Sequence, residues 1–184
     1  MKNNMVQERD IKIENGKITT FVSERCTGMS TLLCQYAADF LKNNDKKVLI
    51  VSHTALSAKH TCEILLSIIK DKARVDYMSI NEAFHKMRFN DYEIVIYDCP
   101  DIRDEDNVLY LNFLSGLKLP KIIIGITWEN IAFDKDINKI IRRKYVNLSN
   151  YSYFFSHTCG DRKLFYEIEN DIMDDLIEDF YGFY

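Results

Sequence analysis

Residues 23–31, Ser-Glu-Arg-Cys-Thr-Gly-Met-Ser-Thr, place a glycine among hydroxyl side chains, between a β-branched segment and a helical pattern. Backbone N–H groups in such a loop can point inward together, and the first turn of a helix adds its positive dipole. Both features attract an anion. The chemistry that this segment could carry is therefore phosphate binding, with Gly28 at the turn and Ser30 at the start of the helix.

A phosphate-binding loop of the pattern G-x-x-x-x-G-K-[ST] holds the outer phosphates with its lysine and Mg²⁺ with its last hydroxyl. Gly28 and Ser30 match this pattern, whereas Ser23 stands at the first glycine and Met29 at the lysine. A methionine carries no positive charge, so Arg25 is the residue that could replace the lysine. The alternative is a glycine turn before an ordinary helix.

Two further residues lie where the rest of a nucleotide site would be. Asp98 ends the apolar segment 94–97, as does the carboxylate that holds Mg²⁺ through water in the second nucleotide-binding motif. Thr127 follows the apolar segment 121–126, where a polar residue can sense the γ-phosphate. Hydrolytic enzymes typically have a glutamate base after the aspartate, and this chain has Cys99. The candidate nucleotide-binding residues are Ser23, Arg25, Thr27, Gly28, Ser30 and Thr31, and the candidate Mg²⁺ ligands are Ser30 and Asp98.

Strands and helices must bring these residues together. Apolar and β-branched segments predict strands at 17–22, 48–51, 74–79, 94–97 and 121–126. Apolar residues at helical spacing and capping signals predict helices near 30–42, 55–69, 81–88 and 104–114. This alternation is typical of a parallel sheet flanked by helices. We therefore expect an α/β domain with a mostly parallel sheet, whose carboxyl edge carries Gly28, Asp98 and Thr127.

The C-terminal third follows a different pattern. Aromatic and β-branched residues in 145–155 predict one strand or a small hairpin. Residues 164, 168, 172 and 176 are apolar and lie four apart, which predicts an amphipathic helix over 162–177. The expected organisation is a phosphate-binding domain over 1–160 and an acidic, aromatic-rich helix and tail over 161–184.

The order of the motifs resembles that of the additional-strand P-loop NTPases, which include phage terminase large-subunit ATPase domains, helicases and RecA-like proteins. Residues 16–21 resemble the RecA-like proteins, and residues 25–30, 48–54 and 78–84 resemble a terminase or helicase core. The likeness covers residues 16–127, and none of its motifs is intact. It implies a degenerate P-loop fold of the RecA/helicase type, with ATP and Mg²⁺ as ligands and a viral, DNA-associated context. The chain has no room for a terminase nuclease domain.

Three functions follow from the altered motifs. The first is a pseudo-ATPase that acts by binding a partner protein, a nucleotide or nucleic-acid machinery. The second is an active ATPase, in which Arg25 or a residue of a neighbouring subunit supplies the missing charge and Asp101 activates water. The third is a structural or inhibitory interaction protein that binds no nucleotide.

The composition is that of an ordinary globular protein, with 47% hydrophobic and 28% charged residues in a chain of 184. No apolar run approaches the roughly 18 residues that span a membrane, and the polar N-terminus is unlike a signal peptide. The five cysteines are scattered and form no C-x-x-C pair, which predicts reduced thiols and no zinc site. We therefore expect a cytoplasmic protein, in the host cytoplasm if the chain is viral.

Negative charge gathers at the C-terminus, where residues 161–184 hold eight acidic and two basic side chains. The net charge of −4 does not signal nucleic-acid binding, which usually comes with an excess of Lys and Arg. Aromatic side chains among acids suit docking on another protein. We expect self-association or capture of a protein partner through this segment, and the alternative is that its helix packs on its own sheet. The aromatic residues are Phe180, Tyr181, Phe183 and Tyr184.

Overall fold

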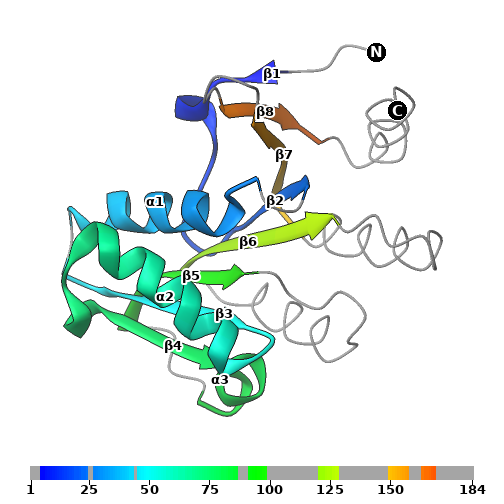
Figure 1. Ribbon diagram of the computed structural model, residues 1–184. Helices are drawn as coiled ribbons and strands as arrows, with labels where there is room; N and C mark the ends of the chain where they lie inside the picture. The colour runs from blue at the N-terminus through cyan, green and yellow to red at the C-terminus, as the bar shows by residue number, and fades with distance from the viewer. Residues whose placement is uncertain are drawn as a thin grey trace, which may run out of the picture.

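An eight-stranded sheet forms the centre of the computed structural model, which describes residues 5–24, 27–43, 45–86, 91–98, 120–128, 149–157 and 163–168 (Figure 1). The strand order is β1-β8-β7-β2-β6-β5-β3-β4. The strands are β1 (Met5–Val6), β2 (Ile18–Glu24), β3 (Lys47–Ser52), β4 (Val75–Ser79), β5 (Tyr92–Asp98), β6 (Lys121–Trp128), β7 (Tyr151–His157) and β8 (Lys163–Glu167).

The sheet is mostly parallel. Strands β7, β2, β6, β5, β3 and β4 all run parallel to their neighbours, and only β8 and β1 join antiparallel, beyond β7. Strand β6 lies between β2, which leads into the glycine loop, and β5, which ends in Asp98. One intervening strand therefore separates the two strands that carry the candidate site. The predicted mostly parallel α/β sheet is confirmed.

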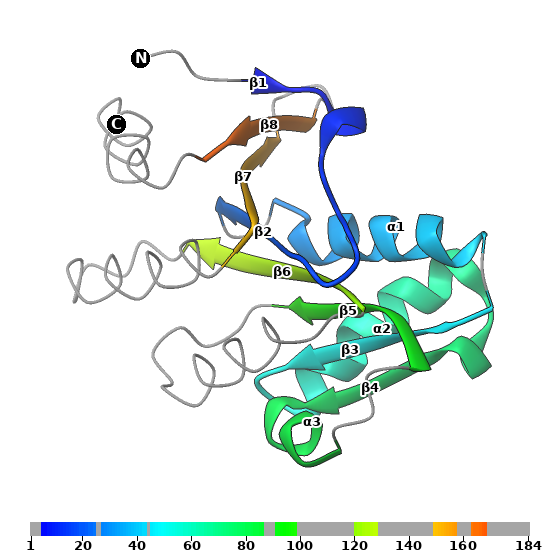
Figure 2. The ribbon, with the colours of Figure 1, turned by 180° about the vertical axis from the view of Figure 1, so that it is seen from behind.

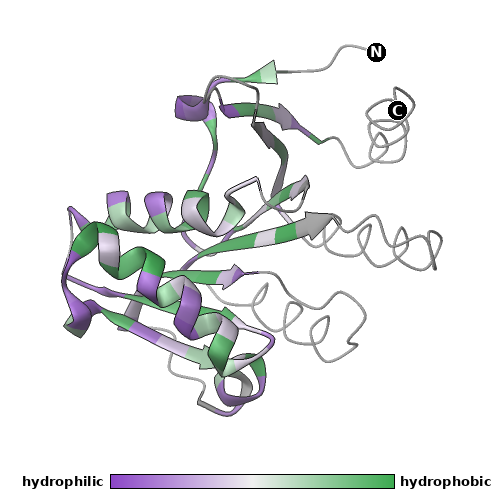
Figure 3. Cartoon of the chain, in the orientation of Figure 1, coloured by the Kyte–Doolittle hydropathy of each residue, from purple (hydrophilic) through white to green (hydrophobic). Residues whose placement is uncertain are grey.

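Helices cover both faces of the parallel strands. Helices α1 (Met29–Leu41) and α2 (Ala55–Ile69) pack on one face, and the short α3 (Ile80–Lys86) packs on the other, as the view from behind shows (Figure 2). The central strands are apolar along their length, whereas the outward sides of the helices are polar (Figure 3). Strands buried on both faces explain the continuous apolar segments of the sequence.

The predicted strands and helices of the first 128 residues match the structure within a few residues. The exceptions are the end of the helix expected over 81–88, since the described part of α3 ends at Lys86, and the helix expected over 104–114, which lies outside the described residues. The two-residue strand β1 and the 3₁₀ turns η1 (Glu8–Asp10) and η2 (Lys72–Arg74) were not predicted. Such short elements carry no periodic pattern.

The helix predicted over 162–177 is wrong for residues 163–167, which form β8. Phe165 is buried, with its ring 5.3 Å from that of Phe155 and 6.3 Å from that of Phe21. A spacing of four residues also fits the two-residue period of a strand, so the apolar residues at 164 and 168 could not distinguish the two structures. Residues 169–184, including the aromatic tail, lie outside the described residues.

Residues 151–157 form strand β7, in keeping with one of the two expectations for 145–155, of which residues 145–148 lie outside the described residues. Strand β7 begins after Asn150, whose Oδ1 accepts a hydrogen bond of 2.9 Å from the N–H of Ile18. Ser149 and Asn150 thus lie directly before the strand. Strand β7 pairs antiparallel with β8.

Lys70 ends α2 in the left-handed conformation, with φ 60° and ψ 3°, and its N–H donates to the carbonyl of Leu66. A side chain is strained in this region, whereas glycine is not. We expect Lys70→Gly to raise the free energy of unfolding by about 0.5–1 kcal/mol, because relief of about 1–2 kcal/mol of left-handed strain is partly offset by the greater entropy of glycine in the unfolded chain. Urea denaturation measures this, with Lys70→Ala as control. An equal gain in the alanine variant would point to the lysine charge and contradict the conformational explanation.

In the described ranges, no helix is long and apolar enough to cross a membrane.

Two of the five cysteines, Cys34 and Cys62, fall in the described ranges, and both are buried with free thiols. The remaining three belong to segments outside the described residues.

Candidate nucleotide-binding site

The glycine loop connects β2 to α1, and a hydrogen bond between the side chains of Ser23 and Thr27 spans it. Ser23 is fully buried near the end of β2, and its Oγ accepts a hydrogen bond of 2.9 Å from the Oγ1 of Thr27. The serine at the first-glycine position therefore ties the two ends of the loop together. Arg25 and Cys26 lie outside the described residues.

Gly28 is the N-cap of α1, with φ 83° and ψ 26°, a left-handed conformation that glycine adopts without strain. Its carbonyl accepts the first bond of the helix, 2.9 Å from the N–H of Leu32. The N–H groups of the first turn have no intrahelical acceptor, and glycine offers no side chain to cap them. Ser30 is half-buried and Thr31 exposed in this turn. This arrangement favours an anion at the start of α1.

Met29, at the lysine position, belongs to the core. Its side chain is 3% exposed and lies over Gly125 of β6. A Cβ atom at Gly125 would lie 2.9 Å from the Met29 Cγ and 2.7 Å from the Leu33 Cδ1. The methionine thus packs flat on the sheet, in space that exists because residue 125 has no side chain.

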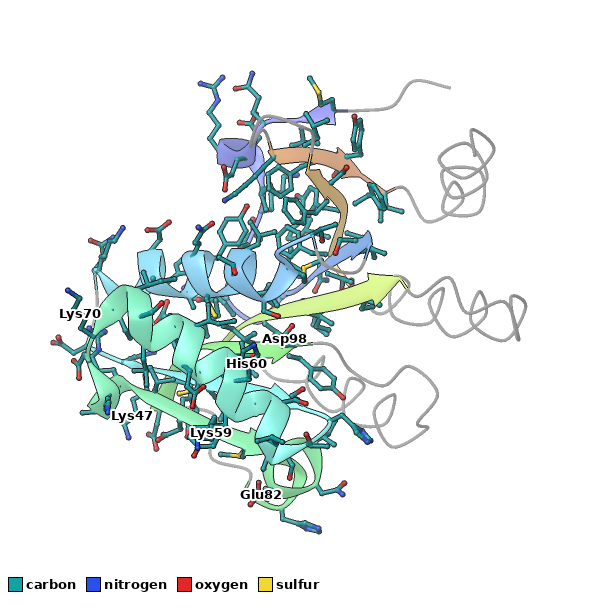
Figure 4. All side chains as sticks on the ribbon, in the orientation of Figure 1. Lys47, Lys59, His60, Lys70, Glu82 and Asp98 are labelled. Atoms are coloured by element: carbon teal, nitrogen blue, oxygen red, sulfur yellow. The ribbon has the colours of Figure 1, made fainter. Side chains whose placement is uncertain are left out.

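Asp98 lies at the end of β5 and is 4% exposed. The Oγ1 of Thr61, in α2, donates a hydrogen bond of 2.5 Å to its Oδ2, and the Oγ of Ser52, in β3, donates one of 2.9 Å to its backbone carbonyl. The other carboxylate oxygen, Oδ1, is buried and has no hydrogen-bond partner. Figure 4 shows Asp98 behind α2, among side chains of the helix-covered face. A buried carboxylate oxygen without a partner calls for a ligand, an ion or a water.

The thiol of Cys34 also lies close to Asp98. Its Sγ donates a hydrogen bond of 3.5 Å to the carbonyl of Thr61. Burial and then the negative charge of Asp98 raise its pKa to about 12. The thiol therefore stays neutral at physiological pH and is a poor nucleophile. The hydrogen bond of Cys34 links α1 to α2 at Thr61, the residue that also donates to Asp98.

The sheet register brings the two halves of the candidate site to one edge. Asp98 pairs with Gly125 in β6, which pairs with Phe21 in β2, and Ser23 pairs with Thr127. Neighbouring strands lie about 4.8 Å apart, so Met29, seated over Gly125, is one strand away from Asp98. The expected placement of the loop and Asp98 at one edge is confirmed for the backbone. The side chain of Thr127 is not described, and Cys99 and Asp101 lie outside the described residues.

The residues present fit a magnesium ion. Mg²⁺ takes oxygen ligands and is usually held by one or two carboxylates together with phosphates and water. The unpartnered Oδ1 of Asp98 supplies such an oxygen, and Ser30 supplies a hydroxyl in the first turn of α1. Among the described residues, no three His, Cys, Asp or Glu side chains come together as they would around zinc.

Sequence reasoning missed Thr61 and Ser52. Thr61 is 2% exposed and shares the buried face of α2 with Ala58, Cys62 and Leu65. A polar residue within the apolar stripe of a helix needs a buried hydrogen-bond partner, and this position could have identified Thr61 from the sequence. Ser52 ends an apolar strand beside the strand of Asp98, which is a weaker signal because strand ends are often polar.

No known protein-family model matches the chain, and no curated protein resembles it in sequence. Solved structures do resemble it. One is the flagellar accessory protein FlaH from Methanocaldococcus jannaschii, with a TM-score of 0.54 and 18% sequence identity over 82% of this chain and 76% of that one. At this identity the likeness concerns the fold alone. Together with the strand order, it shows that the chain shares the α/β fold of that protein, a mostly parallel sheet flanked by helices.

Proposed function

We propose that this chain binds a nucleotide with Mg²⁺ at the carboxyl edge of its sheet and acts through binding rather than efficient hydrolysis. The observation that carries the proposal is the contrast between Asp98 and Met29. The aspartate keeps a buried oxygen without a partner, whereas the residue at the lysine position is an apolar side chain packed on β6. Among the residues that the structure describes, the site thus retains a group for the cation and lacks the charge that activates the phosphates.

Each residue has a distinct part in this proposal. The first-turn N–H groups of α1 and the Ser30 hydroxyl bind the phosphates, helped by the helix dipole. The bond between Ser23 and Thr27 keeps the loop closed around them. Asp98 and Ser30 hold the metal, which neutralises phosphate charge when bound. Cys99 replaces the base, so water activation is weak.

The bound nucleotide serves association, as in the pseudo-ATPase interpretation of the sequence. An active ATPase needs a cation from Arg25 or from a neighbouring subunit, together with another base. No contact of the described residues supplies either. An interaction protein without any nucleotide gives the unpartnered Asp98 oxygen no cation to bind.

Nucleotide titration with and without metal tests the proposal. We expect ATP to bind in Mg²⁺, with turnover close to the uncatalysed rate, and Asp98→Asn to weaken that binding about tenfold or more, because a ligand of the cation loses its charge. Binding in EDTA should be nearly unchanged by the substitution. Asp39→Asn is the matched control, because Asp39 is exposed and pairs with Lys42 on the outer side of α1.

Two results would contradict the proposal. Absence of nucleotide binding by the unmodified chain would favour the interaction protein. Rapid Mg²⁺-dependent hydrolysis that Asp98→Asn abolishes would favour the active ATPase. Calorimetry for binding and phosphate release for turnover distinguish the two.

A further inference from the structure

Thr61 lies in the middle of α2, and its hydroxyl has two acceptors within reach. The Oγ1 is 2.5 Å from the Oδ2 of Asp98 and 3.4 Å from the carbonyl of Ser57. A hydroxyl has a single proton to donate. The short distance and the negative charge of the carboxylate decide the competition, since O–H···O⁻ bonds are short and about twice as strong as neutral ones. The proton is committed to Asp98.

Two elements fix Asp98. Its carbonyl accepts a hydrogen bond from Ser52 in β3, which holds the strand end, and its Oδ2 accepts one from Thr61, which holds the carboxylate. The carboxylate can then not rotate freely, and Oδ2 already accepts one hydrogen bond. Only Oδ1 remains, buried and without a partner.

We propose that Thr61 is a positioning residue that holds the Asp98 carboxylate with its Oδ1 ready for the cation that accompanies the nucleotide. This inference rests on the proposed function and adds a residue from a helix outside the two nucleotide-binding motifs. It also implies that Oδ1 is the oxygen that Asp98 presents to the metal, because it has no other partner among the described residues.

The surroundings of Thr61 support a positioning role. Cys34 of α1 donates to the carbonyl of Thr61, so α1, α2 and β5 meet at this residue. Its side chain is 2% exposed on an otherwise apolar helix face, where valine would fill the same volume without a hydroxyl. Because the side chain is buried, the hydroxyl makes no contact with solvent, and its role is the hydrogen bond to the Asp98 carboxylate. Hydrogen-bond partners of metal ligands typically change metal affinity 10–100-fold when they are removed.

The experiment compares Thr61→Val and Thr61→Ser with the unmodified chain, using ATP in Mg²⁺ and ATP in EDTA. We expect Thr61→Val to lose about tenfold or more of the affinity gained from Mg²⁺, with little change in EDTA. Thr61→Ser keeps the hydroxyl and should stay within about threefold of the unmodified chain. If the valine variant does not fold, Thr61→Cys replaces it, because a thiol fills the space but is a weak donor. The cysteine variant should show an intermediate loss.

Thr54→Val controls for loss of stability in α2. The Oγ1 of Thr54 caps this helix by accepting from the N–H of Ser57, and the Thr54 side chain is exposed at the helix end. The variant should melt at a lower temperature and keep the full Mg²⁺ effect. An equal loss in Thr54→Val and Thr61→Val, or an unchanged Mg²⁺ effect in a folded Thr61→Val, would overturn the positioning role and leave the proposed function standing. Failure of the unmodified chain to bind ATP in either condition would overturn both.

Discussion

Replacing Met29 with lysine and Cys99 with glutamate should raise ATP turnover about 100-fold or more over the unmodified chain. The lysine restores the charge that holds the outer phosphates, and the glutamate restores a base, which alone typically contributes 10²–10⁴-fold. Met29 begins α1, so a lysine there can leave the contact with Gly125 and extend its long, flexible stem toward the edge where the phosphates would be. Phosphate release under saturating ATP and Mg²⁺ measures the change.

The two single variants, and the double variant combined with Asp98→Asn, test whether the added charge and base act at the proposed site. Each single substitution should give a smaller gain than the pair, because the charge and the base act on the same step. The gain should vanish when Asp98→Asn is added to the pair. A double variant that binds ATP and remains folded, yet turns over no faster than the unmodified chain, would show that the loop does not hold the phosphates as proposed.

The parallel core could be predicted from the sequence because its central strands β3, β5 and β6 are apolar over most of their length. Segments such as 94–97 and 121–126 are buried on both faces, and a helix of that length would leave such residues exposed. Gly28 was predicted at the turn because a positive φ before a helix favours glycine, and its φ of 83° agrees. Local rules were sufficient at these positions.

The contacts of the site could not be predicted in the same way. The sequence indicated that Met29 lacks a charge, but its burial over Gly125 depends on the pairing of β2 with β6, which no local pattern contains. The bond between Thr61 and Asp98 joins residues 37 positions apart. Likewise, β8 took its strand conformation from pairing with β7 and β1, because its apolar spacing fitted a helix equally well.

Gly125→Val should lower the free energy of unfolding by about 2–3 kcal/mol, because its new side chain meets atoms that already fill the space. A Cβ there would lie within 3.0 Å of both Met29 and Leu33. Met29→Ala alone should also destabilise the protein, by about 2–5 kcal/mol, because it leaves a cavity. In the double variant the valine occupies part of that cavity. The combined loss should therefore be smaller than the sum by about 1 kcal/mol or more, as expected for residues in contact.

Ile122→Val provides the matched control for this pair. Ile122 lies in the same strand but in the core on the opposite face, with Leu49 and Val95 among its cluster. Its substitution should cost about 0.5–1.5 kcal/mol and add to Met29→Ala within about 0.5 kcal/mol. Urea denaturation of the single and double variants gives both coupling energies. Additivity between Met29→Ala and Gly125→Val would mean that the methionine side chain does not lie on β6, and burial of residue 29 could then no longer explain the lack of phosphate activation.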